Sequence, residues 1–478
     1  MSAKSEKFAA AIVAVSVFFF FYIFFVWLYP LVPMDEDDWL YISVGRHAIP
    51  LWGYWNPSRV FPEVLMPFCG EVPASIVYPV CGDYVKAISI VCAFVLAGAI
   101  AGYAYSFMKL LMEKWECSAW GAGCLSVSFL ILHFLIFRSS LGENDWLFYS
   151  TDVACCFYYT IPTLLNASLV LYFMCNGTMD EILRSAHHPM KNAVLVFVLY
   201  LAVFSNLFCS IVLAGYVITD VMLRFIQTPY KRRFLFQNKI ALVYLGCWGI
   251  SHVLELSGGR AEDVSEDNRF WQQLGMTIDE LGMKSLQVNH TFVILSVISL
   301  VVLMFTIKRS RWESRIPMIV PGVICLVYLI LLSAATVPHY IWRPEVLLGF
   351  CFYVFLFLMV MLREIGRYTP TKVHSLFPIF ILFLWGETVY TSDTHNRTFR
   401  DRFGTNPLIA KQKVTSIVNQ FLEADKTDSS SVVIQVPEDA PFQMNETSIN
   451  LLGLSMYKHG IVSRRFNVDV KFEQTHCK

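Results

Sequence analysis

The chain has 478 residues, of which 56% are hydrophobic and 15% charged, and its formal net charge is zero. A soluble domain of this length cannot bury so much apolar surface in one core, and a neutral chain carries no overall basic signal for nucleic acid. The composition predicts an all-α polytopic membrane protein with membrane lipids around it and no nucleic-acid partner.

Apolar runs of membrane-spanning length recur along the sequence, and each is predicted to form one transmembrane helix of about 17–25 residues. The eleven predicted spans are 8–32, 84–112, 117–137, 153–175, 193–206, 208–226, 239–256, 289–307, 316–335, 345–362 and 375–391. The first run is too long and too aromatic for a signal-peptide core, so we interpret it as a retained helix.

The block 193–226 decides the predicted topology, because it is too long for one ordinary helix. Ser205 and Asn206 offer a polar break in its middle, and we interpret the block as a tight helical hairpin. One long tilted helix is the alternative, and it would invert the orientation of everything that follows. The hairpin makes every inside loop basic, as cytoplasmic loops usually are.

With the amino terminus inside, four loops and the carboxy-terminal region are predicted to face outward. The loops cover residues 33–83, 138–152, 257–288 and 336–344, and the membrane domain 1–391 precedes an outward domain 392–478. Helical patterns at 406–424 and 450–459 and strand patterns at 432–436 and 468–472 make this a small α+β extracytoplasmic domain. The inside loops are too short for a nucleotide-binding domain.

The densest polar cluster is the run of acids from Asp35 to Asp38, which follows the first predicted helix and continues into Trp39 and Tyr41. Partial burial of such acids would raise the pKa of some of them, which suits a general base that takes a proton from a sugar hydroxyl. Tyr41 is expected to stack on a sugar ring. The alternative is a solvated helix start, because acids favour that position.

Arginines on the side that should be poor in them are the second signal. Arg46 and Arg59 lie in an aromatic, Gly- and Pro-rich stretch of the first outer loop, and Arg343 lies in the last one. Arginine binds phosphate through two parallel hydrogen bonds, so a lipid phosphate is a natural ligand. The alternative for the first two is that they neutralise the nearby acids.

Further polar residues are predicted to line a substrate site because they lie at the outer ends of predicted helices. His252 and Glu255 share one side of a helix by their spacing, and two glycines would let Arg260 turn back toward the membrane. The remaining candidates are Glu143, Asp145, Tyr158, Asn206 and His339. For each of these, the alternative is a capping or packing role.

These motifs together resemble the polytopic glycosyltransferases of the GT-C superfamily, and in particular the bacterial and phage glucosyltransferases that convert O-antigen serotype. The resemblance covers most of the chain as a layout. It depends on the acidic first loop, its Gly-Arg and Pro-Ser-Arg continuation, the Tyr-Thr-Ile-Pro helix start, the Ser-Asn break, the Gly-Gly-Arg-Ala turn and the outward carboxy-terminal domain.

The resemblance implies a sugar donor on a polyprenyl phosphate and a lipid-linked or cell-surface glycan as acceptor. Asp37 or Asp38 would deprotonate the acceptor hydroxyl, with Asp38 preferred, and the sugar would be transferred with inversion. Arg59, Arg260 and Arg343 would hold the donor phosphate. A divalent cation at the acids is possible. The protein is expected in a bacterial inner membrane, with a cytoplasmic amino terminus and a periplasmic carboxy terminus.

Three other classes stay open at this point. A transporter or flippase of lipid-linked glycans should carry charged residues at mid-membrane and paired broken helices. A glycan polymerase or ligase would share the donor type. A non-enzymatic assembly factor should have less aromatic and less acidic outer loops. The ionisable residues gather at the predicted outer rim, which favours an enzyme.

Overall fold

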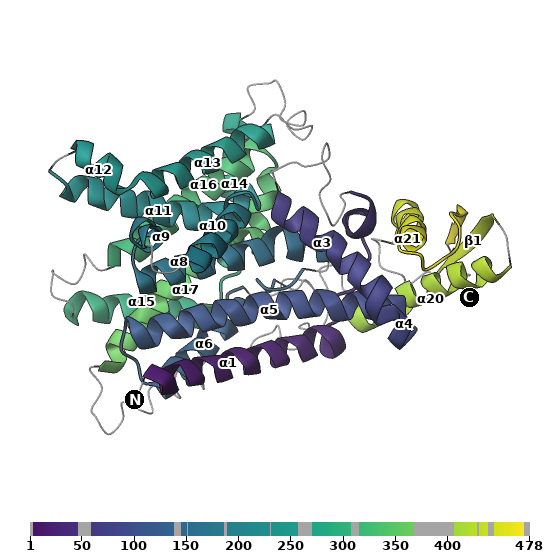
Figure 1. Cartoon of the computed structure of the whole chain (residues 1–478), viewed down its shortest axis with the longest axis horizontal. Coiled ribbons are helices and arrows are strands. Elements are labelled where there is room, and N and C mark those ends of the chain that lie inside the picture. Colours follow the sequence, from purple (N-terminus) through teal and green to yellow (C-terminus); the bar gives the residue numbers. More distant parts are fainter. Residues whose placement is uncertain are drawn as a thin grey trace.

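The chain forms a bundle of long helices with a small α+β domain at one end, as the computed structural model shows (Figure 1). The structure describes residues 3–45, 59–137, 145–150, 152–185, 189–229, 231–256, 270–306, 315–367, 406–427, 430–437 and 444–472, and all structural statements concern these residues. Seven of the described helical segments are long and apolar enough to cross a membrane. The chain is therefore a mostly helical, multi-pass membrane protein.

Ten of the eleven predicted spans coincide with helices, and the eleventh, 375–391, lies outside the described residues. The helices are α1 (Ala3–Ile23) with the π-turn η1 (Phe24–Leu28), α5 (Tyr84–Glu113), α6 (Ala119–Leu135), α7 (Val153–Cys155) continuing through η4 (Cys156–Thr160) into α8 (Ile161–Asn176), α10 (Pro189–Val203), α11 (Leu207–Gln227), α13 (Lys239–Leu256), α15 (His290–Thr306), α16 (Ile316–Ala335) and α17 (Pro344–Arg367).

The polar break predicted at residues 205–206 is present. Helix α10 ends at Val203, and α11 begins at Leu207 with Asn206 as its N-cap. The Asn206 carboxamide oxygen accepts a hydrogen bond from the Phe208 amide at 2.9 Å, which satisfies one of the free amides of a helix start. Two helices, rather than one long tilted helix, therefore occupy this block.

The first predicted outer loop contains a helical run that the sequence interpretation missed. It comprises α3 (Val60–Val72), the π-turn η3 (Pro73–Val77) and α4 (Tyr78–Cys81), and it counts among the seven long apolar segments. Its prolines obscure the helical pattern, because proline usually marks the end of a helix. The π-turn begins at Pro73, where a regular ladder of hydrogen bonds would lose a donor.

Short helices complete the outer segments and the connections between long helices. These are α2 (Glu36–Trp39) with the π-turn η2 (Leu40–Val44), α9 (Met179–Arg184), α12 (Lys231–Gln237), α14 (Phe270–Leu286) and the 3-10 turn η8 (Pro338–Trp342). Helix α14 lies in the predicted outer loop 257–288 and packs on α16 and η8.

The carboxy-terminal domain contains the four predicted elements. They are α20 (Pro407–Lys426), β1 (Ser431–Val436), α21 (Glu446–Lys458) and β2 (Asn467–Phe472), and the two strands pair in parallel. Alternate residues of β1 are buried against α20, whose inner face carries Ile417 and Phe421. Gly453 of α21 packs directly on the Phe421 ring, so apolar side chains fill the space between the helices and strands of this domain.

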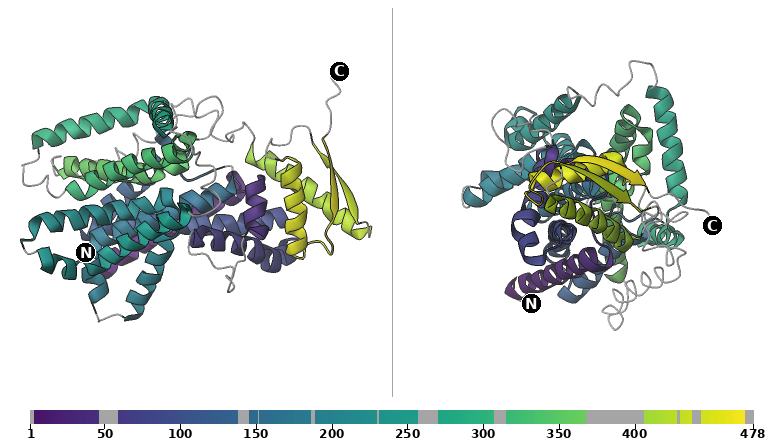
Figure 2. Two further views of the ribbon diagram at one scale, coloured as in Figure 1. Left: turned by 90° about the horizontal axis from the view of Figure 1, so that it is seen from above. Right: turned by 90° about the vertical axis from the view of Figure 1, so that its right-hand side faces the viewer.

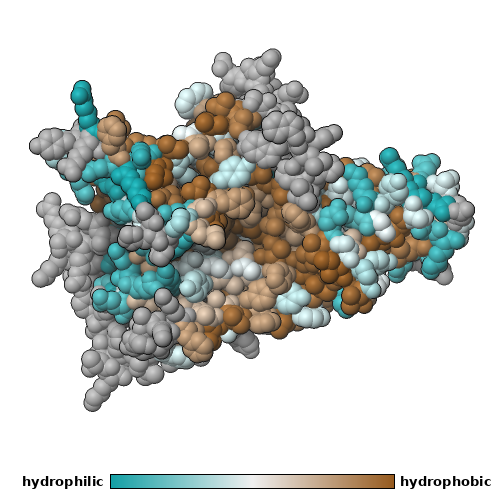
Figure 3. Space-filling view, viewed as in Figure 1, coloured by the Kyte–Doolittle hydropathy of each residue, from teal (hydrophilic) through white to brown (hydrophobic). Residues whose placement is uncertain are grey.

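Polar and apolar surfaces alternate along the long axis of the molecule. On the face shown in Figure 3, a hydrophobic band covers the helical bundle and gives way to hydrophilic surface on the carboxy-terminal domain. The amino terminus and the basic helix α12 lie at the end of the bundle away from that domain (Figures 1 and 2). A continuous hydrophobic band of this kind is typical of helices that face lipid.

Candidate functional site

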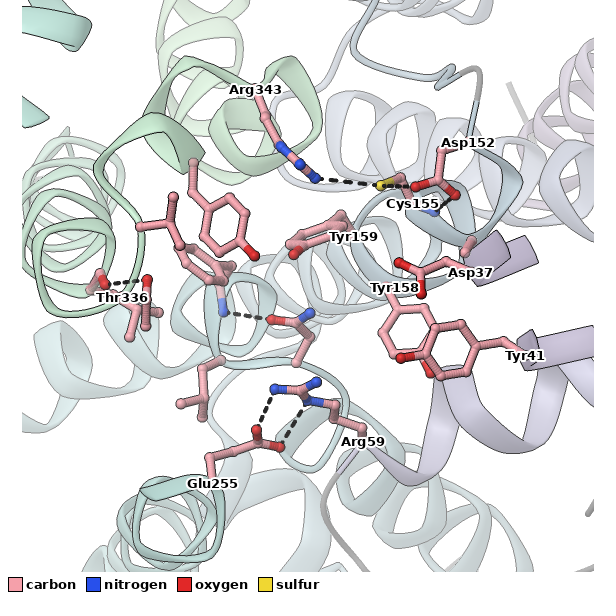
Figure 4. Close-up of a pocket in the computed structure, with 17 residues that line it drawn as sticks. Asp37, Tyr41, Arg59, Asp152, Cys155, Tyr158, Tyr159, Glu255, Thr336 and Arg343 are labelled. Atoms are coloured by element: carbon pink, nitrogen blue, oxygen red, sulfur yellow. Dashed lines mark hydrogen bonds and ion pairs between the residues drawn. The ribbon is translucent and has the colours of Figure 1, made fainter. Parts of the chain in front are cut away.

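One cavity of about 360 Å³ lies where the ends of several helices meet (Figure 4). Its walls come from α2 and η2, the start of α3, the segment from 152 to 159, the start of α11, the end of α13, the end of α16 and η8. The volume is within the usual range for small-ligand sites. Seven predicted site residues line it: Asp37, Tyr41, Arg59, Tyr158, Asn206, Glu255 and Arg343.

Two aspartates form one side of the cavity. Asp37 comes from α2, whose first turn is set by the Asp35 side chain accepting the Asp37 amide at 3.0 Å. Asp152 is the N-cap of α7, and its carboxylate accepts the Cys155 amide at 3.2 Å and the Cys155 thiol at 3.1 Å. Figure 4 shows both carboxyl groups on the same side of the cavity. The cavity therefore has an acidic wall that can accept protons.

Asp38, the base preferred from the sequence, does not line the cavity. Its side chain is fully buried, and its carboxylate accepts backbone amides of Met34 at 2.9 Å, Asp35 at 3.3 Å and Ala154 at 2.7 Å. Burial, and then the charge and hydrogen bond of Asp152, raise the pKa of Asp38 well above its usual value. Asp38 thus joins the start of α2 to the start of α7 and positions the two acids that do face the cavity.

The other residues of the acidic run point elsewhere. Asp35 caps α2 and forms a capping box with Asp38, and burial, as the largest cause, raises the pKa of Asp35. Trp39 is buried in the core of the bundle. Tyr41 does face the cavity, where its ring lies 4.8 Å from that of Tyr158, centroid to centroid. This pair provides an aromatic surface beside the acids, of the kind that sugar rings pack against.

Arg343 reaches the cavity from the side opposite Arg59 and Glu255 in Figure 4. Its guanidinium lies 4.9 Å from the centre of the Tyr340 ring and 3.7 Å from the Cys155 sulfur. Its Nε is buried and has no hydrogen-bond partner within the described part of the chain. A guanidinium held by a ring, with an unused donor, is suited to an incoming anion.

Arg59 is already engaged. Its guanidinium forms a two-point ion pair with Glu255, in which Nε donates to Oε1 at 3.0 Å and Nη2 donates to Oε2. Arg59 also has a positive φ of 53°, a conformation that residues other than glycine adopt rarely. The pair joins the start of α3 to the end of α13 at the cavity edge.

Three predicted site residues have structural partners away from the cavity. Asp145 forms a buried ion pair with Lys284 of α14 at 2.8 Å. The His252 ring contacts the Trp248 carbonyl at 2.8 Å and the Tyr328 hydroxyl at 2.6 Å, so both of its nitrogens are used. His339 stacks on Trp342 and lies 3.4 Å from Glu280. The site prediction places all three at the substrate, and the geometry instead gives them packing roles.

Arg46, Glu143 and Arg260 lie outside the described residues, so their predicted roles stay predictions. The suggestion of a divalent cation also stays a prediction. Within the described ranges, no group of three or more His, Cys, Asp or Glu is arranged to hold a metal ion.

The cavity also contains residues that were not predicted as site residues, notably Asp152, Cys155, Tyr159 and Tyr340. Asp152 could have been found, because it directly precedes a predicted helix and is therefore a candidate N-cap that faces the outer side. Tyr159 lies beside the candidate Tyr158 at a predicted helix start, and Tyr340 lies beside the candidate His339, so both belong to stretches in which the sequence predicts substrate contact.

Comparison with known proteins gives no family: no family model, curated protein or solved structure matches this chain.

Proposed function

We propose that the chain is an inverting membrane glycosyltransferase that moves a sugar from a polyprenyl-phosphate donor to a lipid-linked or cell-surface glycan. The observation that carries the proposal is the composition of one cavity. It brings Asp37 and Asp152 together on one side, with Arg343 and Arg59 reaching it from other sides. Such a cavity offers a proton acceptor, an aromatic surface and a phosphate-binding group within one small volume.

In the proposed reaction Asp37 is the base, in place of Asp38. The acceptor hydroxyl attacks the anomeric carbon, and its proton passes to the Asp37 carboxylate. The bond between the anomeric carbon and the phosphate oxygen breaks, and the polyprenyl phosphate leaves with the electron pair. Asp37 suits this role because it lines the cavity, whereas backbone amides occupy the buried Asp38.

Arg343 is proposed to bind the donor phosphate. The donor phosphate is already an anion before the bond to the sugar breaks, so a guanidinium beside it contributes mainly to binding of the donor. The unused buried Nε of Arg343 supports this role. The pair of Tyr41 and Tyr158 is proposed to pack against the sugar between the phosphate and the base.

The proposed site faces the outer side of a bacterial inner membrane. Helix α12, with three consecutive basic residues, lies at the opposite end from the carboxy-terminal domain, and basic residues favour the cytoplasmic side. A lipid-linked donor needs no cytoplasmic nucleotide site. This assignment predicts a cytoplasmic amino terminus and a periplasmic carboxy-terminal domain.

Sugar transfer in membrane vesicles tests the proposal. Vesicles carrying the chain receive a polyprenyl-phosphate hexose with a labelled sugar, and label in the membrane glycan is measured. Asp37→Asn is expected to lower transfer by a factor of about 10² to 10⁴, the usual effect of losing a general base. Glu36→Gln is the matched control, because Glu36 is the adjacent acid on α2, exposed and away from the cavity lining.

Two results would contradict the proposal. Transfer unchanged in both Asp37→Asn and Asp152→Asn would remove the acidic wall from the mechanism. Labelled lipid that crosses the membrane intact, with no label reaching glycan, would indicate a transporter.

A further inference from the structure

The segment that carries Asp37 and Tyr41 is held between the membrane bundle and the carboxy-terminal domain. Helix α21 of that domain packs on both α2 and η2, and α3 packs on η2 from the bundle side. The carboxy-terminal domain therefore contacts the short stretch of backbone that forms part of the cavity wall. Figure 1 shows α21 beside the end of the bundle where α3 and α4 lie.

Gly70 is the point where these three elements meet. A methyl group built on Gly70 of α3 would lie 2.6 Å from the Ile42 carbonyl oxygen of η2 and 2.7 Å from the Cε1 atom of His459, which follows α21. Both distances are far below a normal carbon contact. The backbone of η2 and the imidazole of His459 therefore approach this closely only because residue 70 has no side chain.

His459 is anchored in the bundle rather than resting on its surface. Its Nδ1 lies 2.7 Å from the hydroxyl of Tyr84, the first residue of α5, and 3.4 Å from the Ser455 hydroxyl. The Tyr84 side chain is fully buried. The neighbouring Lys458 donates to the Ser43 carbonyl of η2 at 3.4 Å, which adds a second contact to the same segment.

We propose that the carboxy-terminal domain is a positioning element of the cavity, acting through the contact of His459 with Gly70 and Ile42. The hydrogen bond from the Ala154 amide to the Asp38 carboxylate holds the start of α2 on α7, and η2 is packed between α3 and α21. The packing of α21 against η2 determines where Tyr41 and Asp37 lie relative to Asp152. His459 is thus a positioning residue, and the cavity depends on a domain that contributes none of its lining residues.

The native Cys155 provides a readout that does not depend on the reaction. It lines the cavity beside Asp152, and its side chain is only slightly exposed. If α2–η2 moves outward, the cavity widens at Asp152 and Cys155 becomes more reactive toward a small thiol reagent. Cys325, fully buried in α16, is an internal reference for the intact bundle.

The experiment compares Gly70→Ala with Gly98→Ala in the full-length protein in membranes. Gly98 is a helical glycine of α5 with open space around it, so its extra methyl meets nothing within 4 Å. Iodoacetamide labelling of each cysteine is followed by mass spectrometry of peptides. In Gly70→Ala, Cys155 is expected to react about tenfold faster than in wild type, because overpacking at the contact displaces η2. Gly98→Ala is expected to match wild type.

His459→Ala is the second variant, and it removes the contact without adding volume. It is expected to accelerate labelling of Cys155 in the same direction, with Cys325 unchanged. Wild-type labelling of Cys155 in both variants would overturn the proposal. Equal acceleration at Cys155 and Cys325 would also overturn it, because that result means general loosening of the bundle.

The expected effect on sugar transfer rests on the proposed function. The experiments can refute the glycosyltransferase proposal and the positioning role of the carboxy-terminal domain independently. Transfer by Gly70→Ala is expected to lose kcat with little change in the donor KM, since Arg343 follows η8 and is not part of the displaced segment. If no variant and no wild-type sample transfers sugar, the glycosyltransferase proposal fails. The labelling result still decides whether the carboxy-terminal domain positions the cavity.

Discussion

The buried ion pair between Asp145 and Lys284 leads to a specific prediction about how α14 is held on the helical bundle. Lys284 is the only charged anchor of α14 described in the bundle interior, and its Nζ lies 2.8 Å from the Asp145 carboxylate with both side chains almost fully buried. The ammonium also lies 4.6 Å from the centre of the Phe137 ring and 5.0 Å from that of Trp342. Replacing Lys284 by methionine keeps the length of the side chain and removes the charge.

The expected cost follows from what Lys284→Met leaves behind. Asp145 would stay buried at 5% side-chain exposure without its counter-charge, and breaking a buried pair from one side typically costs about 3–5 kcal/mol. That is well above the value of less than about 1 kcal/mol for a surface pair. The lost stability is expected to appear as more frequent local unfolding of α14, because Lys284 lies in the last turn of that helix.

Hydrogen exchange of the detergent-solubilised protein measures this opening. Amides of α14 are expected to exchange about 10²- to 10³-fold faster in Lys284→Met, the equivalent of roughly 3–4 kcal/mol, while α5 stays at its wild-type rate. The double variant Asp145→Asn with Lys284→Met carries neither charge and is expected to recover most of the protection. Exchange within about threefold of wild type in the single variant, or no recovery in the double, would refute the reasoning.

Two further predictions concern the ends of the molecule. Burial, as the first cause, lowers the pKa of His459 to about 4. The contribution of the neutral imidazole to the free energy of folding is therefore complete above about pH 6.5 and is lost progressively as the pH falls from there toward 4. Hydrogen exchange of α21, corrected for the intrinsic rate, should rise over this window, and His459→Phe should make the exchange less dependent on pH. Asp180 is buried and accepts the amides of Ile240 and Ala241 at 3.1 and 3.0 Å, so Asp180→Ala should destabilise the protein by about 2–3 kcal/mol in thermal unfolding. Asp220→Ala, which breaks only a partly exposed pair, should cost no more than about 0.5 kcal/mol, and equal costs would contradict the capping role.

The long helices were predictable because their signal is local. An apolar run of the right length must be a helix inside a membrane, since no other open structure satisfies its backbone there. The ends of helices could be predicted from the sequence where a capping residue is present, as at Asn206 before α11. The run from Val60 to Cys81 was missed because its prolines break the pattern that marks a helix, although α3 contains Pro62 and Pro67 and the π-turn η3 begins at Pro73.

The candidate site was predictable in part, and its errors have specific causes. Seven candidates line one cavity because they lie at or beside the ends of helices that meet there. The preference for Asp38 over Asp37 ignored a readable pattern: Asp35 and Asp38 have the spacing of a capping box, which turns Asp38 back toward its own helix start. Asp145 could not be excluded from the sequence, because its partner Lys284 is 139 positions away and only the fold brings them together.

The two arginines of the cavity are not equivalent, and this difference bears on the order of events in the proposed reaction. Glu255 fills the fork of Arg59 in the structure, so a phosphate must displace a carboxylate to reach it. Arg343 is held instead by the Tyr340 ring and the Cys155 thiol, and no ion pair with a carboxylate occupies it within the described residues. An anionic donor is therefore expected to bind first at Arg343 and to recruit Arg59 only as charge grows on the leaving phosphate. On this argument Arg343→Gln should raise the donor KM, whereas Arg59→Gln should mainly lower kcat, and steady-state kinetics that reversed the two would reject the assignment.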